Sequence, residues 1–411
     1  MDGSRPHRKI KLGMKEGSQL QLQDLSDDVL EHILLRLGSG LWLIRAAAVC
    51  KRWRAVVVAD TGFLTRFRHV PLVLGHYHTA DNEWKGYREW SVAGGAVFLP
   101  CSAPVVHRRH LSLEFLPDCE SWEVADSRGG LLLLSKKRTG REAIWHAGFP
   151  DMMVCEPLTG RCQAILSPPA DLKKHDCIAM LLLDGDGGIH MSNFRVLAAV
   201  NVPLVSVFSS SSGGWRLAHN DLLFSAGIHG GYQNFLGRAN GRLYMAAHGE
   251  DDKDVFVLDE ATAAFSLVSF PANMWGSDGC DRWIHRMVGR EDGALRAVRV
   301  TGGNDLKVFV QEPAGCGEWT LEKFLSLPEA TRGLPGHQDH FFEGTAYIVA
   351  ANERYVLITP TCTMWLFTVE LDTMQVESLH ERNKFPGEAY PYQLPWPPTL
   401  QACSTTSIHH N

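Results

Sequence analysis

The chain has 411 residues, 45% of them hydrophobic and 21% charged, which is the composition of an ordinary globular protein with more than one small domain. Its net charge of -6 argues against a general nucleic-acid binder, because such proteins carry a basic excess. We find no apolar run of membrane-spanning length and no secretory signal, and the ten cysteines include no Cys-x-x-Cys pair. We therefore expect reduced thiols, a cytoplasmic and/or nuclear location, and no membrane or nucleic-acid partner.

Residues 1–20 form a short basic segment. Its positive charges are Arg5, Arg8, Lys9, Lys11 and Lys15. The composition predicts a solvated, disordered arm, with nuclear import or contact with an anionic surface as the alternative role.

Residues 21–68 follow a helical pattern. The apolar residues recur at helical spacing and comprise Val29, Leu30, Ile33, Leu34 and Leu37. Ser26 is the expected N-cap, and Asp27 and Asp28 place negative charge where the helix dipole favours it. Gly38 and Gly40 are expected to end this helix. A hairpin this short cannot bury all its apolar surface against itself, so we expect part of that surface to meet a partner.

This stretch resembles the F-box. The family pattern has an acidic start, an Ile-Leu-x-x-Leu helix and a Val-Cys-Lys-x-Trp end, and this chain departs from it at Ser26 and Gly38, where proline is usual. The resemblance implies docking on a Skp-type adaptor and, through it, on a cullin-RING ubiquitin ligase. The adaptor-binding residues it implies are Leu25, Asp28, Val29, Leu30, Ile33, Leu34, Leu37, Leu43, Val49, Cys50 and Trp53.

Residues 69–380 contain short strand-length runs separated by Gly, Asp, Ser and Pro. A strand near a glycine, a second strand, a turn and a third strand recur roughly every 50 to 60 residues, the period of propeller blades. We therefore predict an all-β domain, a β-propeller of about six blades, with a β-sandwich or open sheet as the rival. The predicted strands are 131–134, 152–155, 162–166, 194–200, 204–208, 241–244, 255–258, 265–270, 293–300, 306–310, 319–324, 344–349, 365–369 and 376–379.

A looser copy of the repeat spans 84–117, with strands at 97–99 and 111–116, and a Pro-rich tail is expected at 381–411. The phrases DSRGGLLLL, VCEPLTG, GRLYMAA and VFVLDEAT resemble the associated β-rich domain of plant F-box proteins. The tail YPYQLPWPPTLQAC resembles that of grass members of the group. In these proteins the C-terminal region is taken to receive the substrate.

Candidate chemistry in the β-rich part is sparse. Asp184 to Gly188 starts like a calcium loop but lacks its later ligands, so a tight turn is expected. The pairs His76/His78 and His107/His110 lack two further convergent ligands for zinc. Cys155 and Cys162 flank a turn and could face each other across a hairpin, and two reduced thiols on paired strands are the default expectation. Catalytic and phosphate-binding motifs are missing, so we expect no cofactor, no metal and no catalysis by this chain.

These features together predict an interaction protein. It would be the substrate-receptor subunit of a Skp-cullin-F-box ubiquitin ligase, with the F-box on the adaptor and the β-rich domain on an unknown target protein. Two alternatives stay open: an F-box scaffold that acts outside degradation, and a propeller enzyme that carries an F-box-like hairpin.

Overall fold

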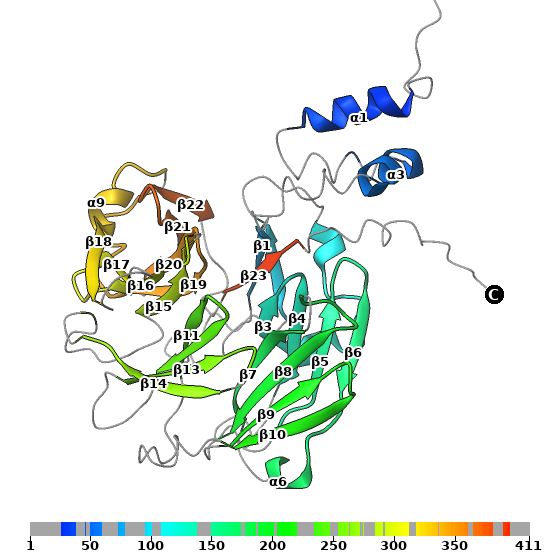
Figure 1. Ribbon diagram of the computed structural model, residues 1–411. Coiled ribbons are helices and arrows are strands. Elements are labelled where there is room, and N and C mark those ends of the chain that lie inside the picture. The colour runs from blue at the N-terminus through cyan, green and yellow to red at the C-terminus, as the bar shows by residue number, and fades with distance from the viewer. Residues whose placement is uncertain are drawn as a thin grey trace, which may run out of the picture. The chain divides into compact units, whose positions relative to one another are not determined.

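The structure is a computed structural model, and its chain separates into two compact units (Figure 1). One unit comprises Met1–Val70 with Trp396–Asn411, and the other comprises Pro71–Pro395. The residues that the structure describes are 26–37, 46, 50–59, 73–78, 95–100, 108–137, 149–173, 177–185, 188–200, 204–219, 234–246, 254–262, 264–271, 274, 284–290, 292–311, 318–335, 337–360, 365–380 and 389–394. The expected basic arm at 1–20 lies outside them.

The first unit contains two described helices, α1 (Asp27–Leu35) and α3 (Lys51–Ala59), which contact each other. The second unit is built from mainly antiparallel sheets, with short helical turns among its described residues. Those turns are η2 (Arg108–Leu111), η3 (Cys119–Ser121), α6 (Ala170–Lys173) and α9 (Leu327–Thr331).

Most sheets of the second unit are meanders of four consecutive antiparallel strands. One contains β3 (Trp122–Arg128), β4 (Leu131–Lys136), β5 (Met152–Glu156) and β6 (Arg161–Ile165). The next contains β7 (Cys177–Asp184), β8 (Phe194–Val200), β9 (Leu204–Ser209) and β10 (Gly214–His219). Another contains β19 (Ala346–Ala351), β20 (Tyr355–Pro360), β21 (Leu366–Glu370) and β22 (Val376–His380).

An eight-stranded sheet joins two further meanders edge to edge. The first has β11 (Asn234–Ala239), β12 (Arg242–Ala246), β13 (Asp254–Asp259) and β14 (Phe265–Ser269), and the second has β15 (His285–Gly289), β16 (Leu295–Val300), β17 (Asp305–Gln311) and β18 (Trp319–Ser326). They meet through a parallel pairing of β11 with β15. Gly237 makes this approach possible, because a Cβ there would lie 2.1 Å from the Met287 carbonyl oxygen.

The core lies between consecutive meanders. The first strand of a meander, here called its inner strand, packs against both the preceding and the following meander, as β7 shows. In β7, Leu182 packs with Val154 of the preceding meander, whereas Leu181 and Leu183 pack with Leu243 of the following one. Alternating side chains thus bury both faces of the sheet. The fourth strands are less buried than the inner ones: β14 is largely exposed and β18 is partly exposed, so burial decreases outward across these meanders.

The remaining sheet brings together distant parts of the chain. β1 (Val73–His78) pairs with β2 (Val97–Pro100) and with β23 (Ala389–Gln393), and β23 also contacts β3 and β19. The last described strand therefore lies between the first and last four-stranded meanders. β23 falls within the range expected to be tail, so the β-rich unit extends past residue 380 because this strand completes the sheet of β1. The arrangement is consistent with about six blades, and the blade count itself stays a prediction.

Most predicted strands are present, but the one at 111–116 is wrong. The chain there forms η2 followed by turns, including a bond from the Leu116 N–H to the Leu113 carbonyl. Its apolar spacing reflects burial of Leu111, Leu113 and Leu116 in a folded loop. Several strands were not anticipated from the sequence: β3, β7, β11, β15, β20 and β23.

Candidate functional site

Helix α1 begins as its sequence predicts. The Ser26 hydroxyl accepts a hydrogen bond from the Val29 N–H at 3.4 Å, and the Ser26 carbonyl accepts the Leu30 N–H at 3.0 Å. Asp27 and Asp28 lie in the first turn, where the helix dipole favours their negative charge. Arg36 caps the other end, so the helix stops before Gly38 and Gly40, which lie outside the described residues.

The apolar residues of α1 divide into a buried pair and an exposed pair. Leu30 and Leu34 are each 1% exposed, whereas Val29 is 46% exposed and Ile33 is 40% exposed. At about 100° per residue the two pairs lie side by side along the helix. The buried pair therefore holds the helical unit together, and the exposed pair leaves apolar surface available to a partner.

Helix α3 supports α1 from within the same unit. Val57 is its most buried described side chain, and the Arg52 Nε donates to Asp27 Oδ1 at 2.8 Å. Both of these charged side chains are substantially exposed, so the ion pair contributes little to stability. The pair joins the first turn of α1 to α3.

The other predicted adaptor-binding residues are spread over this unit. Asp28 and Cys50 are exposed, and Leu37 and Trp53 are half-buried. Leu25, Leu43 and Val49 lie outside the described residues. Leu35 is an exposed apolar residue that the family pattern does not single out, and it lies on the opposite side of α1, about 200° from Ile33.

In the β-rich unit, charged side chains link neighbouring meanders. Arg128 donates to both oxygens of Glu260, at 2.8 and 2.7 Å, and to Asp184 at 2.6 Å. Arg195 donates to the backbone carbonyls of Asp184 and Glu260. Residues from three successive meanders thus share one cluster, which is a typical way to satisfy partly buried charges.

A second contact between meanders joins their first strands, β3, β7 and β11. The Asp126 carboxylate accepts the Leu182 N–H at 2.6 Å and pairs with Arg238. Burial raises the pKa of Asp126 above its ordinary value, while Arg238 and the Leu182 N–H act in the opposite direction. Arg238 also donates to the Leu182 carbonyl at 2.5 Å, so β3, β7 and β11 are joined at this point.

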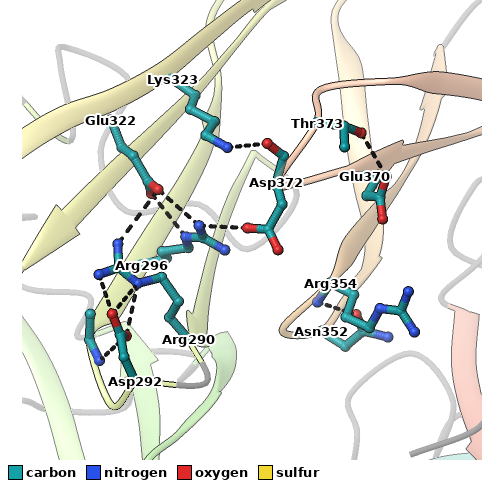
Figure 2. A network of polar contacts seen from close by, with 11 residues as sticks. Arg290, Asp292, Arg296, Glu322, Lys323, Asn352, Arg354, Glu370, Asp372 and Thr373 are labelled. Carbon is teal, nitrogen blue, oxygen red and sulfur yellow. Dashed lines mark hydrogen bonds and ion pairs between the residues drawn. The ribbon is translucent and has the colours of Figure 1, made fainter. Parts of the chain in front are cut away.

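A third link, the Arg296 network, joins the meanders β15–β18 and β19–β22 (Figure 2). The nearly buried Arg296 forms a two-pronged pair with Glu322 at 2.9 Å and donates to Asp372 at 2.8 Å. Nearby, hydrogen bonds from Arg290 and from the Ala294 N–H hold the pKa of Asp292 down to about 2. Figure 2 shows these groups turned toward one another, so the network connects the two meanders through side-chain hydrogen bonds.

The possible metal-binding motifs have structural explanations. The expected turn at Asp184–Gly188 is confirmed by a 3.2 Å hydrogen bond from the Gly188 N–H to the Gly185 carbonyl. His76 and His78 are buried in β1, and His76 Nε2 lies 2.8 Å from the Tyr355 hydroxyl. Within the described ranges, no group of three or more His, Cys, Asp or Glu residues is placed to hold a metal ion.

None of the described helices is both long and apolar enough to cross a membrane. The candidate site is the exposed pair Val29 and Ile33 on α1. The charged residues of the β-rich unit described above mainly join its sheets.

Several solved structures are similar to this chain at low identity. A chain of a nidogen/laminin complex is 11% identical with a TM-score of 0.41, covering 77% of this chain and 95% of the other. The Cps50 (Swd1) β-propeller domain of Myceliophteria thermophila is 11% identical with a TM-score of 0.39, covering 76% and 88%. YCF48 from Cyanidioschyzon merolae is 9% identical with a TM-score of 0.37, covering 62% and 70%. At such low scores these likenesses carry no argument about function.

The chain matches no curated protein, but two families match it. The F-box domain matches residues 22–60, which confirms the expected helical module. The family described as "F-box protein AT5G49610-like, beta-propeller" matches residues 123–400, more than half of the chain, and its description bears the name of an Arabidopsis protein. The expected order of a small F-box module followed by a β-propeller is thereby confirmed. The chain belongs to the AT5G49610-like F-box β-propeller family, a group of the substrate-receptor type.

Proposed function

We propose that this protein is the substrate-receptor subunit of a Skp-cullin-F-box ubiquitin ligase. The observation that carries the proposal is the exposed pair Val29 and Ile33, which lies beside the buried Leu30 and Leu34 on a helix inside the F-box match. Full burial of an aliphatic side chain is worth about 1.5–3 kcal/mol, so covering these half-exposed residues contributes roughly 1 kcal/mol each. A Skp-type adaptor is the partner that the F-box implies.

The proposed role needs no chemistry from this chain. An adaptor on the F-box and a target on the β-propeller would hold the target near a ubiquitin thioester carried by another subunit. Transfer would then become an effectively intramolecular reaction, accelerated by a raised local concentration of the target lysine. A role without catalysis agrees with the charged clusters around Arg128 and Arg296, because their side chains are used to join sheets. We therefore propose a non-catalytic subunit.

Three further points belong to the same proposal. The target protein would bind the propeller through its loops, since loops carry recognition on a rigid scaffold. The complex would work in the cytoplasm, the nucleus or both. The tail segment YPYQLPWPPTLQAC supports a grass-type member of the family.

The test compares matched substitutions on one helix. Val29→Asp with Ile33→Asp places two charges on the exposed pair and should weaken binding of a purified Skp-type adaptor by roughly 100-fold, or about 3 kcal/mol. Leu35→Asp is the control, because Leu35 is similarly exposed but lies on the opposite side of α1. Isothermal titration calorimetry measures both affinities, and circular dichroism checks folding.

The choice of residues decides what the result means. Leu34 is buried, so Leu34→Asp, with or without Trp53→Ala, would abolish binding by unfolding the helical unit. Unchanged affinity in the Val29/Ile33 variant would contradict the proposal. Equal loss in the Leu35 control would show that the exposed pair is not the docking surface.

A further inference from the structure

The sheet β3–β6 ends in a hairpin that places two cysteines opposite each other. Cys155 on β5 and Cys162 on β6 are direct register partners, next to the pair Glu156 and Arg161 that closes the hairpin. Of the five cysteines in the described part of the chain, these two are paired in this way. The register therefore confirms that the two cysteines lie opposite each other across the hairpin.

The hairpin holds this register firmly. The buried Glu156 carboxylate accepts Arg161 Nε at 3.0 Å and the Thr159 hydroxyl at 2.5 Å. The Glu156 carbonyl accepts the N–H groups of Thr159 and Gly160, and Gly160 takes the positive φ of 66° that the turn requires. Because side chain and backbone agree on one register, the two cysteines cannot slip past each other.

The geometry suits a covalent bond between them. Directly opposed residues on antiparallel strands project to the same face, with Cα atoms about 4.5–5.5 Å apart. A disulfide requires Cα atoms roughly 4.4–6.8 Å apart, so this pairing is compatible without strand movement. We propose that Cys155 and Cys162 form a reversible disulfide across the β5–β6 hairpin when the protein meets a peroxide.

The two thiols differ in accessibility, which assigns their roles. Cys162 is exposed on the outermost strand, whereas Cys155 is fully buried. The Cys162 thiolate attacks a peroxide oxygen, the O–O bond breaks, and a sulfenic acid and one water form after protonation. The Cys155 sulfur then attacks the Cys162 sulfur, releases a second water and completes the S–S bond. Overall, two thiols lose two electrons and two protons, and the peroxide is reduced to two waters.

The reaction is expected to be slow. Burial raises the pKa of both thiols, and the neighbouring Cys162 raises that of Cys155 further because two thiolates repel. Little thiolate is present near neutral pH, so the cross-link accumulates under sustained oxidation and is removed by a dithiol. The pair would therefore report lasting oxidation and would not respond to a brief pulse.

Trypsin provides a direct test, because Arg161 lies between the two cysteines. Cleavage yields peptides 142–161 and 162–173, which stay joined only if the disulfide has formed. The native full-length protein is treated with hydrogen peroxide, alkylated, digested without reductant and analysed by mass spectrometry. We expect the linked peptide pair, its separation by dithiothreitol, its loss in Cys162→Ser and in Cys155→Ala, and its retention in the control Cys119→Ser.

Two results would overturn the proposal. One is two separately alkylated peptides after a peroxide dose that already oxidises the exposed Cys50. The other is a linked pair that appears only when the chain is oxidised in denaturant, since the folded hairpin would then not be its source. Cys162 is exposed, so its substitution by serine leaves a folded protein for comparison.

Discussion

At the scale of single residues, Asn304 shows how one side chain can hold a long connection in place. It is buried at the β16–β17 turn with a positive φ of 60°. Its amide nitrogen donates to the carbonyls of Phe342 and Gly344 at 3.0 and 2.9 Å, and its amide oxygen accepts the Ala346 N–H at 2.6 Å. Asparagine suits this position because it tolerates the left-handed region and both donates and accepts.

This arrangement gives a prediction for two substitutions. Asn304→Ala should lower the free energy of unfolding by roughly 3 kcal/mol, because buried backbone groups lose partners and alanine is strained at positive φ. Asn304→Gly loses the same bonds without the strain, so it should be about 1 kcal/mol more stable than the alanine variant. Urea denaturation of both variants measures the difference. Two unchanged midpoints would show that the loop is held by other contacts.

At the scale of elements, three of the unanticipated strands, β3, β7 and β11, depart from simple apolar alternation. β3 carries Asp126 and Arg128, and β11 carries Arg238, so their sequences lack a plain apolar run. The register of β3, β7 and β11 against the next strand is also interrupted by a bulge, which breaks strict alternation. The charged side chains of β3 and β11 are tolerated between the sheets because they form ion pairs with residues of other sheets. Local periodicity therefore misses strands such as β3 and β11, whose charged side chains have partners on other sheets.

The pairing of β23 with β1 leads to a prediction at the same scale. Tyr392 of β23 packs against Tyr77 of β1, with ring centroids 5.7 Å apart, and both side chains are fully buried. A chain truncated after residue 388 loses this strand together with Tyr392, and the Tyr77 ring loses its cover. We expect its melting temperature to fall by at least about 10 °C, or cooperative unfolding to be lost.

The matched control for this truncation is a chain ending at residue 395, which keeps β23 and the whole compact β-rich unit. Differential scanning calorimetry should give this chain the melting transition of the full-length protein. Equal behaviour of the two truncated chains would contradict a closing role for β23.

At the scale of the whole molecule, the sequence predicts the two-part organisation, whereas the contacts between distant segments need the structure. Repeated turns indicate a propeller, but the pairing of Arg296 with Asp372 joins residues 76 positions apart and has no local signal. The same holds for the site. Helical spacing places Val29, Ile33 and Leu34 on one apolar face, and only the packing of α1 on α3 separates the exposed from the buried residues.

The central claim is that one end of this protein joins a ligase while the other end holds a target. Quantitative affinity purification under proteasome inhibition, comparing the full-length protein with the Val29→Asp/Ile33→Asp variant, tests it most directly. We predict that the variant loses the Skp-type adaptor and the cullin and keeps the proteins bound by the β-propeller, with less ubiquitin attached to them. Retention of adaptor and cullin by the variant, or unchanged ubiquitin on the bound proteins, would contradict the account.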